Sequence, residues 1–145
     1  MKSNTLQLAQ LFLRIALSVS FLSAVADRFG FWGNPGSPNV VWGNWQNFLD
    51  YSNQVNSFIP AALAEPLAIA ATILEIVLPV FLLFGYKTKM AAWISGCLLS
   101  GFGLAMTISF GVKSPLDYSV FTAAAAAFVL AGIDRYAYSL DERLP

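Results

Sequence analysis

The chain has 145 residues, of which 57% are hydrophobic and only 11% are charged, and its formal net charge at pH 7 is zero. This composition is too apolar for an ordinary soluble domain, and the scattered basic residues exclude a nucleic-acid-binding patch. We therefore expect residues 1–145 to form one integral membrane domain.

Four apolar stretches are each about 20 residues long, the length that a helix needs to cross about 30 Å of hydrocarbon. They cover residues 6–26, 62–84, 90–112 and 115–133. The short alternating segments of a transmembrane β-barrel are missing from the sequence, so the predicted class is all-α. We predict a multi-pass four-helix bundle.

The first span, residues 6–26, has polar residues at spacings of three and four, which place them on one helical face. They are Gln7, Gln10, Arg14 and Ser18. A charge in lipid is costly, so this face should look into protein. Lys2 and the A-x-A pattern at 24–26 are also typical of a cleaved secretory signal, but the polar residues within the stretch argue against that alternative.

The longest connection, residues 29–61, should lie on the outer side. Its first part is rich in turn-forming residues and contains Trp32 and Trp42, which suit a membrane interface. Its second part, about residues 45–59, alternates apolar and polar residues at helical spacing. This pattern predicts an amphipathic interfacial helix on the membrane surface or across the mouth of the bundle.

The second span contains Glu75 and, four residues later, Pro79, whose missing N–H should kink the helix beside the carboxylate. At 1.5 Å per residue, Arg14 and Glu75 lie about 12 and about 13 Å from the cytoplasmic boundary. Two buried charges at one depth can form an ion pair. We therefore expect an intramembrane polar core around Arg14 and Glu75, with Gln10, Ser18 and Pro79 beside it.

The third span places small residues four apart, which lets helices approach closely in lipid. These residues are Ala92, Gly96 and Ser100, followed by Gly103, Thr107 and Gly111. At the start of the fourth span, Ser114, Pro115 and Asp117 match the N-cap, N1 and N3 positions of a helix.

The charges at the span ends should meet water and headgroups. They include Asp27, Arg28, Lys113, Asp117 and the mixed tail of Asp134, Arg135, Asp141, Glu142 and Arg143. An even number of spans puts both termini on one side, where the basic residues are more numerous. Those on that side are Lys2, Lys87, Lys89, Arg135 and Arg143, against Arg28 and Lys113 opposite. Both termini are therefore predicted to be cytoplasmic.

The residue inventory limits the chemistry. The chain has no histidine, and Cys97 is its single cysteine, so the usual haem ligands, His-based zinc sites, histidine bases and Cys-x-x-Cys motifs are excluded. We assign no catalytic residue and no metal site. If electrons pass through this protein, a diffusible cofactor such as a quinone or a partner-held group must carry them.

Three segments resemble the DoxX family of small four-helix bacterial membrane proteins. They are LFLRIALSVSFL around Arg14, LEIVLPVFLLFGYKTKMAAW from Leu74, and AGIDRYAYSLDE from Ala131. The chain departs from the family pattern at Ser18, Arg28 and Asp134. The resemblance implies an inner-membrane location and association with thiosulfate:quinone oxidoreductases or oxidative-stress complexes.

These observations leave three functional hypotheses. The first is a subunit, not an enzyme on its own, that anchors a redox partner protein, with Arg14 and Glu75 as a structural pair. The second is a quinone-linked oxidoreductase subunit in which Arg14 holds a quinone oxygen and Glu75 exchanges a proton. The third is a carrier for a small solute or lipid, gated by the 45–59 helix. Expected partners are membrane lipids, a redox protein and further copies of the chain, but not nucleic acid.

Overall fold

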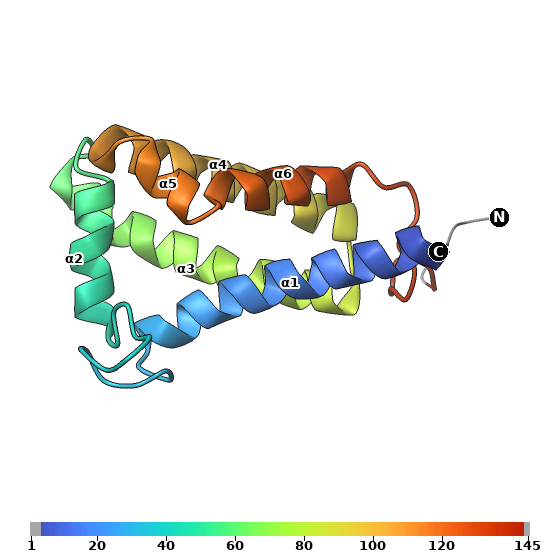
Figure 1. Cartoon of the computed structure of the whole chain (residues 1–145), viewed down its shortest axis with the longest axis horizontal. Coiled ribbons are helices and arrows are strands. Elements are labelled where there is room, and N and C mark those ends of the chain that lie inside the picture. The colour runs from blue at the N-terminus through green and yellow to red at the C-terminus, as the bar shows by residue number, and fades with distance from the viewer. Residues whose placement is uncertain (1–3, 144–145) are drawn as a thin grey trace.

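The computed structural model describes residues 4–143, and these residues form helices and no strand. The long helices α1 (Asn4–Arg28) and α3 (Ala61–Phe84) run antiparallel, and α4 (Thr88–Phe110) packs beside α6 (Val120–Ala131). Figure 1 shows α2 (Trp45–Val55) lying across one end of these helices, while the start of α1 and the C-terminal segment lie at the other end. We call these the α2 end and the inner end. Lys2, used above for the orientation, lies outside the described residues.

Within residues 4–143, three helices are long and apolar enough to cross a membrane. They are α1, α3 and α4, with 25, 24 and 23 residues, and they correspond to the first three predicted spans. Large apolar side chains such as Phe12, Ile73 and Leu104 are exposed on the outside of the bundle. A shell of this kind suits lipid rather than water.

The predicted fourth span, residues 115–133, does not form one continuous helix. The chain forms a short helix, α5 (Lys113–Asp117), and then α6, with Ser119 between them in the left-handed conformation at φ 55°. The apolar helix α6 has 12 residues, or about 18 Å of rise, which is less than the hydrocarbon thickness. Polar residues just before it compete for backbone hydrogen bonds and favour a break.

The predicted cap of the fourth helix is also wrong, because Ser114 lies inside α5 and the N-cap position is Val112. Asp117 instead forms an exposed ion pair with Lys113.

The predicted close approach of helices at the small residues of α4 is confirmed at two glycines. A Cβ added at Gly96 would meet Phe128 Cε1 at 2.6 Å, and one at Gly103 would meet Phe121 Cε1 at 2.6 Å. Both phenylalanines belong to α6, so the absence of side chains on α4 lets the α6 rings seat directly on its backbone.

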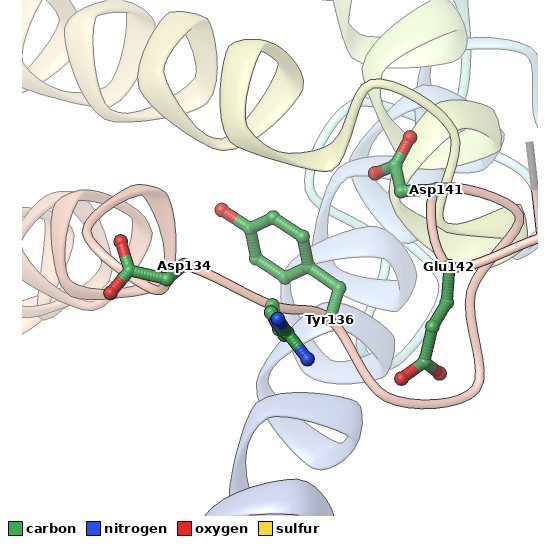
Figure 2. A pocket seen from close by; sticks show the side chains of 5 residues that line it. Asp134, Tyr136, Asp141 and Glu142 are labelled. Atoms are coloured by element: carbon green, nitrogen blue, oxygen red, sulfur yellow. The ribbon is translucent and has the colours of Figure 1, made fainter. Parts of the chain in front are cut away.

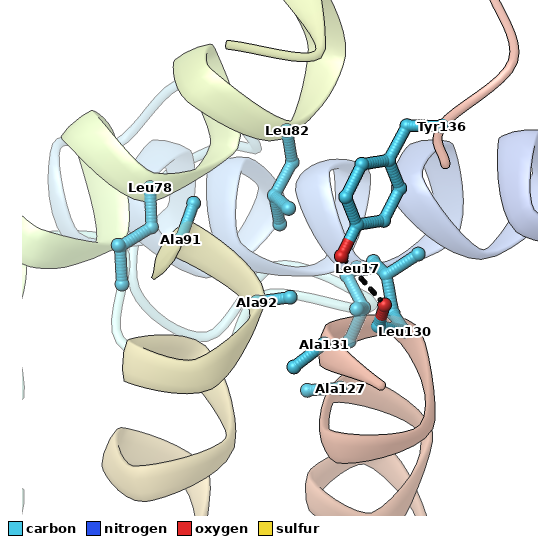
Figure 3. Packing of buried hydrophobic residues seen from close by; sticks show 9 residues of the cluster. All are labelled: Leu17, Leu78, Leu82, Ala91, Ala92, Ala127, Leu130, Ala131 and Tyr136. Atoms are coloured by element: carbon cyan, nitrogen blue, oxygen red, sulfur yellow. Dashed lines mark hydrogen bonds between the residues drawn. The ribbon is translucent and has the colours of Figure 1, made fainter. Parts of the chain in front are cut away.

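The apolar core lies between the two helix pairs toward the inner end. Figure 3 shows its side chains converging from α1, α3, α4, α6 and the C-terminal segment. They are Leu17, Leu78, Leu82, Ala91, Ala92, Ala127, Leu130, Ala131 and Tyr136. The Tyr136 hydroxyl donates to the carbonyl of Leu130 at 3.0 Å, so the one polar group of this cluster is satisfied.

The helix α2 begins at an N-cap, Asn44, whose side chain accepts from the Asn47 N–H at 2.8 Å. It ends at Val55, before the predicted Ile59. Its buried residues face α3 and α4, and the Ser109 hydroxyl donates to the Val55 carbonyl at 2.6 Å. The amphipathic segment therefore packs across the mouth of the bundle.

Candidate functional site

Arg14 is fully buried and binds backbone carbonyls. Its Nε donates to Leu82 O at 2.7 Å and Nη2 to Leu83 O at 3.1 Å. Nη1 donates to Ala137 O at 3.0 Å and Tyr138 O at 3.4 Å. A single guanidinium thus ties α1 to the end of α3 and to the C-terminal segment. We call these contacts the Arg14 clamp.

The clamp helps to satisfy the last turn of α3, whose final four carbonyls have no partner within the helix. The Phe81 carbonyl accepts from the Tyr86 N–H at 2.9 Å, and that of Phe84 accepts from the Leu140 N–H at 3.1 Å. The two carbonyls between them bind Arg14. Buried helix ends are stable only with such partners.

Gly85 makes room for the clamp. It ends α3 in the left-handed conformation at φ 64°, and an added Cβ would meet Arg14 Nη2 at 2.5 Å. The next helix is capped by the tail, because the Asp141 carboxylate accepts from the N–H groups of Lys87 at 2.6 Å and Thr88 at 2.8 Å. Asp141 is partly exposed, as expected for the tail, and it also caps α4.

Two further predicted residues lie along the same face of α1. With its amide oriented to satisfy both neighbours, Gln10 donates to Arg135 O and accepts from the Ala137 N–H, both at 3.3 Å. The Ser18 hydroxyl lies 3.2 Å from the carbonyl of Pro79 and bonds within its own helix at 2.7 Å. These polar side chains bind backbone groups, which points to a structural role.

Glu75 pairs with Arg28, and the expected ion pair between Arg14 and Glu75 is wrong. Arg28 Nη1 contacts Glu75 Oε2 and also donates to Thr72 Oγ1 at 2.7 Å. Arg28 and Glu75 are each 3% exposed, so this is a buried ion pair.

Arg14 and Glu75 do not meet because their side chains point in opposite directions, although the two residues lie at similar depths. Side chains on a helix lean toward its N-terminus. Because α1 and α3 are antiparallel, Arg14 reaches toward the inner end while Glu75 reaches toward the α2 end. Arg28, the last residue of α1, leans back into the bundle and meets Glu75.

Asp27 and Arg28 are buried, which contradicts their expected contact with water and headgroups. The carboxylate of Asp27 accepts from the N–H groups of Val41 at 2.9 Å, Trp42 at 3.2 Å and Gly43 at 3.2 Å. These two adjacent residues thus bind different parts of the α2 end. Asp27 binds the turn before α2, and Arg28 binds the helix α3.

A signal for Arg28 was present in the sequence. The buried residues Arg14, Ser18, Phe21, Val25 and Arg28 recur at alternating steps of four and three along α1. That spacing puts Arg28 on the same face as Arg14. Thr72, three residues before Glu75, was detectable by the same rule.

Aromatic rings cover the ion pair. The guanidinium carbon of Arg28 lies 3.9 Å from the centre of the Phe48 ring and 5.5 Å from that of Trp42. Among the described residues, neither Arg28 Nε nor Trp42 Nε1 finds a hydrogen-bond acceptor, although both atoms are buried. An unsatisfied buried donor costs about 1–3 kcal/mol. In the structure as it stands, both donors carry this penalty.

Two cavities flank the polar clusters. One, of about 410 Å³, lies between α1 and the outer loop and is lined in part by Ser23, Asp27, Trp32 and Trp42. The other, of about 280 Å³, lies at the inner end. The inner cavity is lined by Asp134, Arg135, Tyr136, Asp141 and Glu142.

Figure 2 shows the carboxylates of the inner cavity spread around Tyr136 rather than converging on one point. Within residues 4–143, no group of three or more His, Cys, Asp or Glu side chains is arranged to hold a metal. Burial, with the charges of Asp141 and Asp134, raises the pKa of Tyr136 to about 12. The phenol is therefore neutral at ordinary pH, when it donates to the Leu130 carbonyl.

The sequence model of one family, described as DoxX, matches residues 9–133. Searches among curated proteins and among solved structures found no match to this chain. The matched range contains Arg14, Arg28 and Glu75, all of α3 and α4, and α1 from residue 9 onward. The chain therefore belongs to the DoxX family and is a membrane protein.

Proposed function

We propose that the protein is a non-catalytic subunit of the bacterial inner membrane that anchors a redox partner protein. The observation that supports this is the internal use of both intramembrane charges. Arg14 is bound by carbonyls of its own chain, and Glu75 by Arg28. Intramembrane charges that bind groups of their own chain favour a scaffold over a reaction centre.

The orientation belongs to the same proposal. Both termini face the cytoplasm, and α2 faces the periplasm, as the distribution of basic residues indicates. The redox partner would dock on this scaffold, and lipids or further copies of the chain would surround it.

Native mass spectrometry on protein extracted gently from its own membrane tests the anchor. We expect a retained partner protein with flavin or haem absorbance in a fixed ratio to the chain. The matched control is the variant Arg28→Met with Glu75→Leu, which removes the ion pair and should still retain the partner. A chain recovered with lipids alone would reject the proposal, and so would a partner lost in a folded double variant.

The second candidate function is a quinone-linked subunit. Its quinone site would lie at Arg28 rather than at Arg14, where the sequence predicts it. Its support is the pair of buried donors without acceptors, Arg28 Nε and Trp42 Nε1, beside the Phe48 ring. A quinone headgroup supplies carbonyl acceptors and a planar ring, and Glu75 would exchange the proton that quinone reduction requires.

The test of this candidate is quinone retained on purification, measured in wild type and in Trp42→Phe, which keeps an aromatic ring but removes the indole donor. The matched control is Trp32→Phe, because Trp32 Nε1 already donates to Ser23 O at 3.1 Å. Loss of quinone in the first variant alone favours the site. No retained quinone in wild type, or equal loss in both, rejects it.

The carrier hypothesis gains no support from these contacts. The Arg14 clamp joins α1, α3 and the C-terminal segment at the inner end, where a transport path would have to open.

A further inference from the structure

We propose that α2 and the turn residues 41–43 form a lid, closed in this structure, whose opening admits water and small polar solutes to the Arg28–Glu75 ion pair. The lid acts at the α2 end of the bundle and does not depend on the anchoring role. It would make a buried charge pair accessible from one side of the membrane only.

The lid covers the ion pair directly. Phe48, on α2, places its ring 3.9 Å from the guanidinium carbon of Arg28, and Trp42, in the preceding turn, lies 5.5 Å from it. Arg28 is the last residue of α1 and so marks the end of the bundle. Figure 1 shows α2 crossing this end of the bundle.

The lid is attached to the bundle along one face of α2, where Tyr51 also packs on Phe110 and on the cluster of Val55, Ala105 and Met106. The buried residues of α2 are Phe48, Ser52 and Val55, and its opposite face is polar. The Ser109 hydroxyl holds its C-terminal end through the Val55 carbonyl at 2.6 Å. Segments with few buried apolar contacts open at lower free energy than the helices beneath them.

Both ends of α2 join non-helical chain that can absorb a hinge motion. Residues 29–44 precede α2 and residues 56–60 follow it, and both segments consist of turns and bends. Hinges are usually a few such residues at the ends of elements. On the first side, the amides of residues 41–43 donate to the Asp27 carboxylate of α1, so these three hydrogen bonds must break when the turn opens with α2.

The closed state carries a polar penalty that opening would relieve. Arg28 Nε and Trp42 Nε1 are buried without acceptors among the described residues. Entering water would supply those acceptors, whereas closure regains the aromatic contact with Arg28. Opposed contributions of this kind produce two discrete states rather than one rigid cover.

Thiol labelling in detergent micelles tests whether the pair becomes accessible. The reporter is Thr72→Cys, beside Arg28, and the matched control is Ser95→Cys, buried in the core of α4; both are made with Cys97→Ser. A charged thiol reagent should modify the reporter and not the control. Adding Phe48→Ala should speed modification of the reporter by about tenfold and leave the control unchanged. Equal rates at both sites, or equal acceleration of both, would overturn the proposal.

Hydrogen exchange tests the lid without a reporter in its core. In the unmodified protein, the amides of 41–55 should exchange together, and faster than those in the middle of α3. The Ser57 and Ser109 hydroxyl oxygens lie 3.2 Å apart, so cysteines there can form a disulfide. In Ser57→Cys/Ser109→Cys with Cys97→Ser, oxidation should slow exchange over 41–55 and reduction should restore it. The proposal would be refuted if the amides of 41–55 exchanged as slowly as those of α3, or if forming the disulfide left their exchange rate unchanged.

Discussion

The ion pair between Arg28 and Glu75 can be measured as a coupling energy. The side chains of both residues are 4% exposed, so Glu75→Leu leaves a buried guanidinium without its carboxylate. Removing one partner of a buried pair costs about 3–5 kcal/mol. Arg28 keeps its hydrogen bond to Thr72, so we expect about 3 kcal/mol, the lower end of that range.

The double variant Arg28→Met/Glu75→Leu should recover most of this loss. Replacing a buried ion pair by apolar residues of similar volume is often neutral or stabilising. We expect a coupling energy of about 3 kcal/mol or more between these residues, because each single variant leaves one charge stranded. The control cycle, Arg14→Met with Glu75→Leu, should be additive within about 0.5 kcal/mol, since the two side chains point to opposite ends of the bundle.

Reversible unfolding in mixed micelles, followed by tryptophan emission, gives the four free energies of unfolding in each cycle. Changes of about 3 kcal/mol are large compared with a typical free energy of unfolding of about 5–15 kcal/mol, so the assay can resolve them. Strong coupling of Glu75 to Arg14, or additivity of Glu75 with Arg28, would refute the assignment of partners and the side-chain argument behind it.

Three further predictions concern the inner end. Gly85→Ala should lower the free energy of unfolding by about 2–5 kcal/mol, because the left-handed backbone and the approach of Arg14 both oppose a Cβ. The control Gly101→Ala has open space around it and should change the free energy of unfolding by less than about 1 kcal/mol in the same assay. Asp141→Ala should cost about 1–2 kcal/mol by uncapping α4, and wild-type stability in Asp141→Ala would argue against the cap. Burial raises the pKa of Tyr136 from 10.0 to about 12, so the unfolded chain loses the phenol proton at a lower pH than the folded one. The free energy of unfolding should therefore fall as the pH rises from about 10 to about 12. Tyr136→Phe should remove this contribution, and an unchanged pH profile in that variant would contradict the prediction.

The burial of Arg14 and Glu75 could be predicted from the sequence because it follows from span length and the cost of charge in lipid. The glycines of α4 were predictable for a similar reason, since small residues at steps of four permit close packing. The partners of the two charges were not predictable from depth. They depend on which way each side chain leans and on how α1 and α3 are paired, and these are properties of the tertiary structure.

The ends of the spans were harder than their centres. Asp27 resembles an ordinary boundary charge, and nothing local reveals that the outer loop folds back onto it. The break at Ser119 has the same origin: an apolar count over 115–133 indicates one helix, whereas a single left-handed residue divides it. Loop closure and backbone conformation at one position leave little trace in hydropathy.

The three segments that resemble the DoxX family meet at the inner end. The first segment supplies Arg14. The second supplies two of the carbonyls that Arg14 binds, and also Gly85, which leaves room for the guanidinium. The third supplies the Ala137 carbonyl, which binds Arg14, and Asp141, which caps α4. Because most of these contacts are made to the backbone, they close the bundle at this end rather than form a ligand site. The α2 end has the opposite character, with a buried ion pair and unsatisfied donors beneath a short amphipathic helix. In this chain the α2 end therefore offers free hydrogen-bonding capacity that the inner end lacks at Arg14.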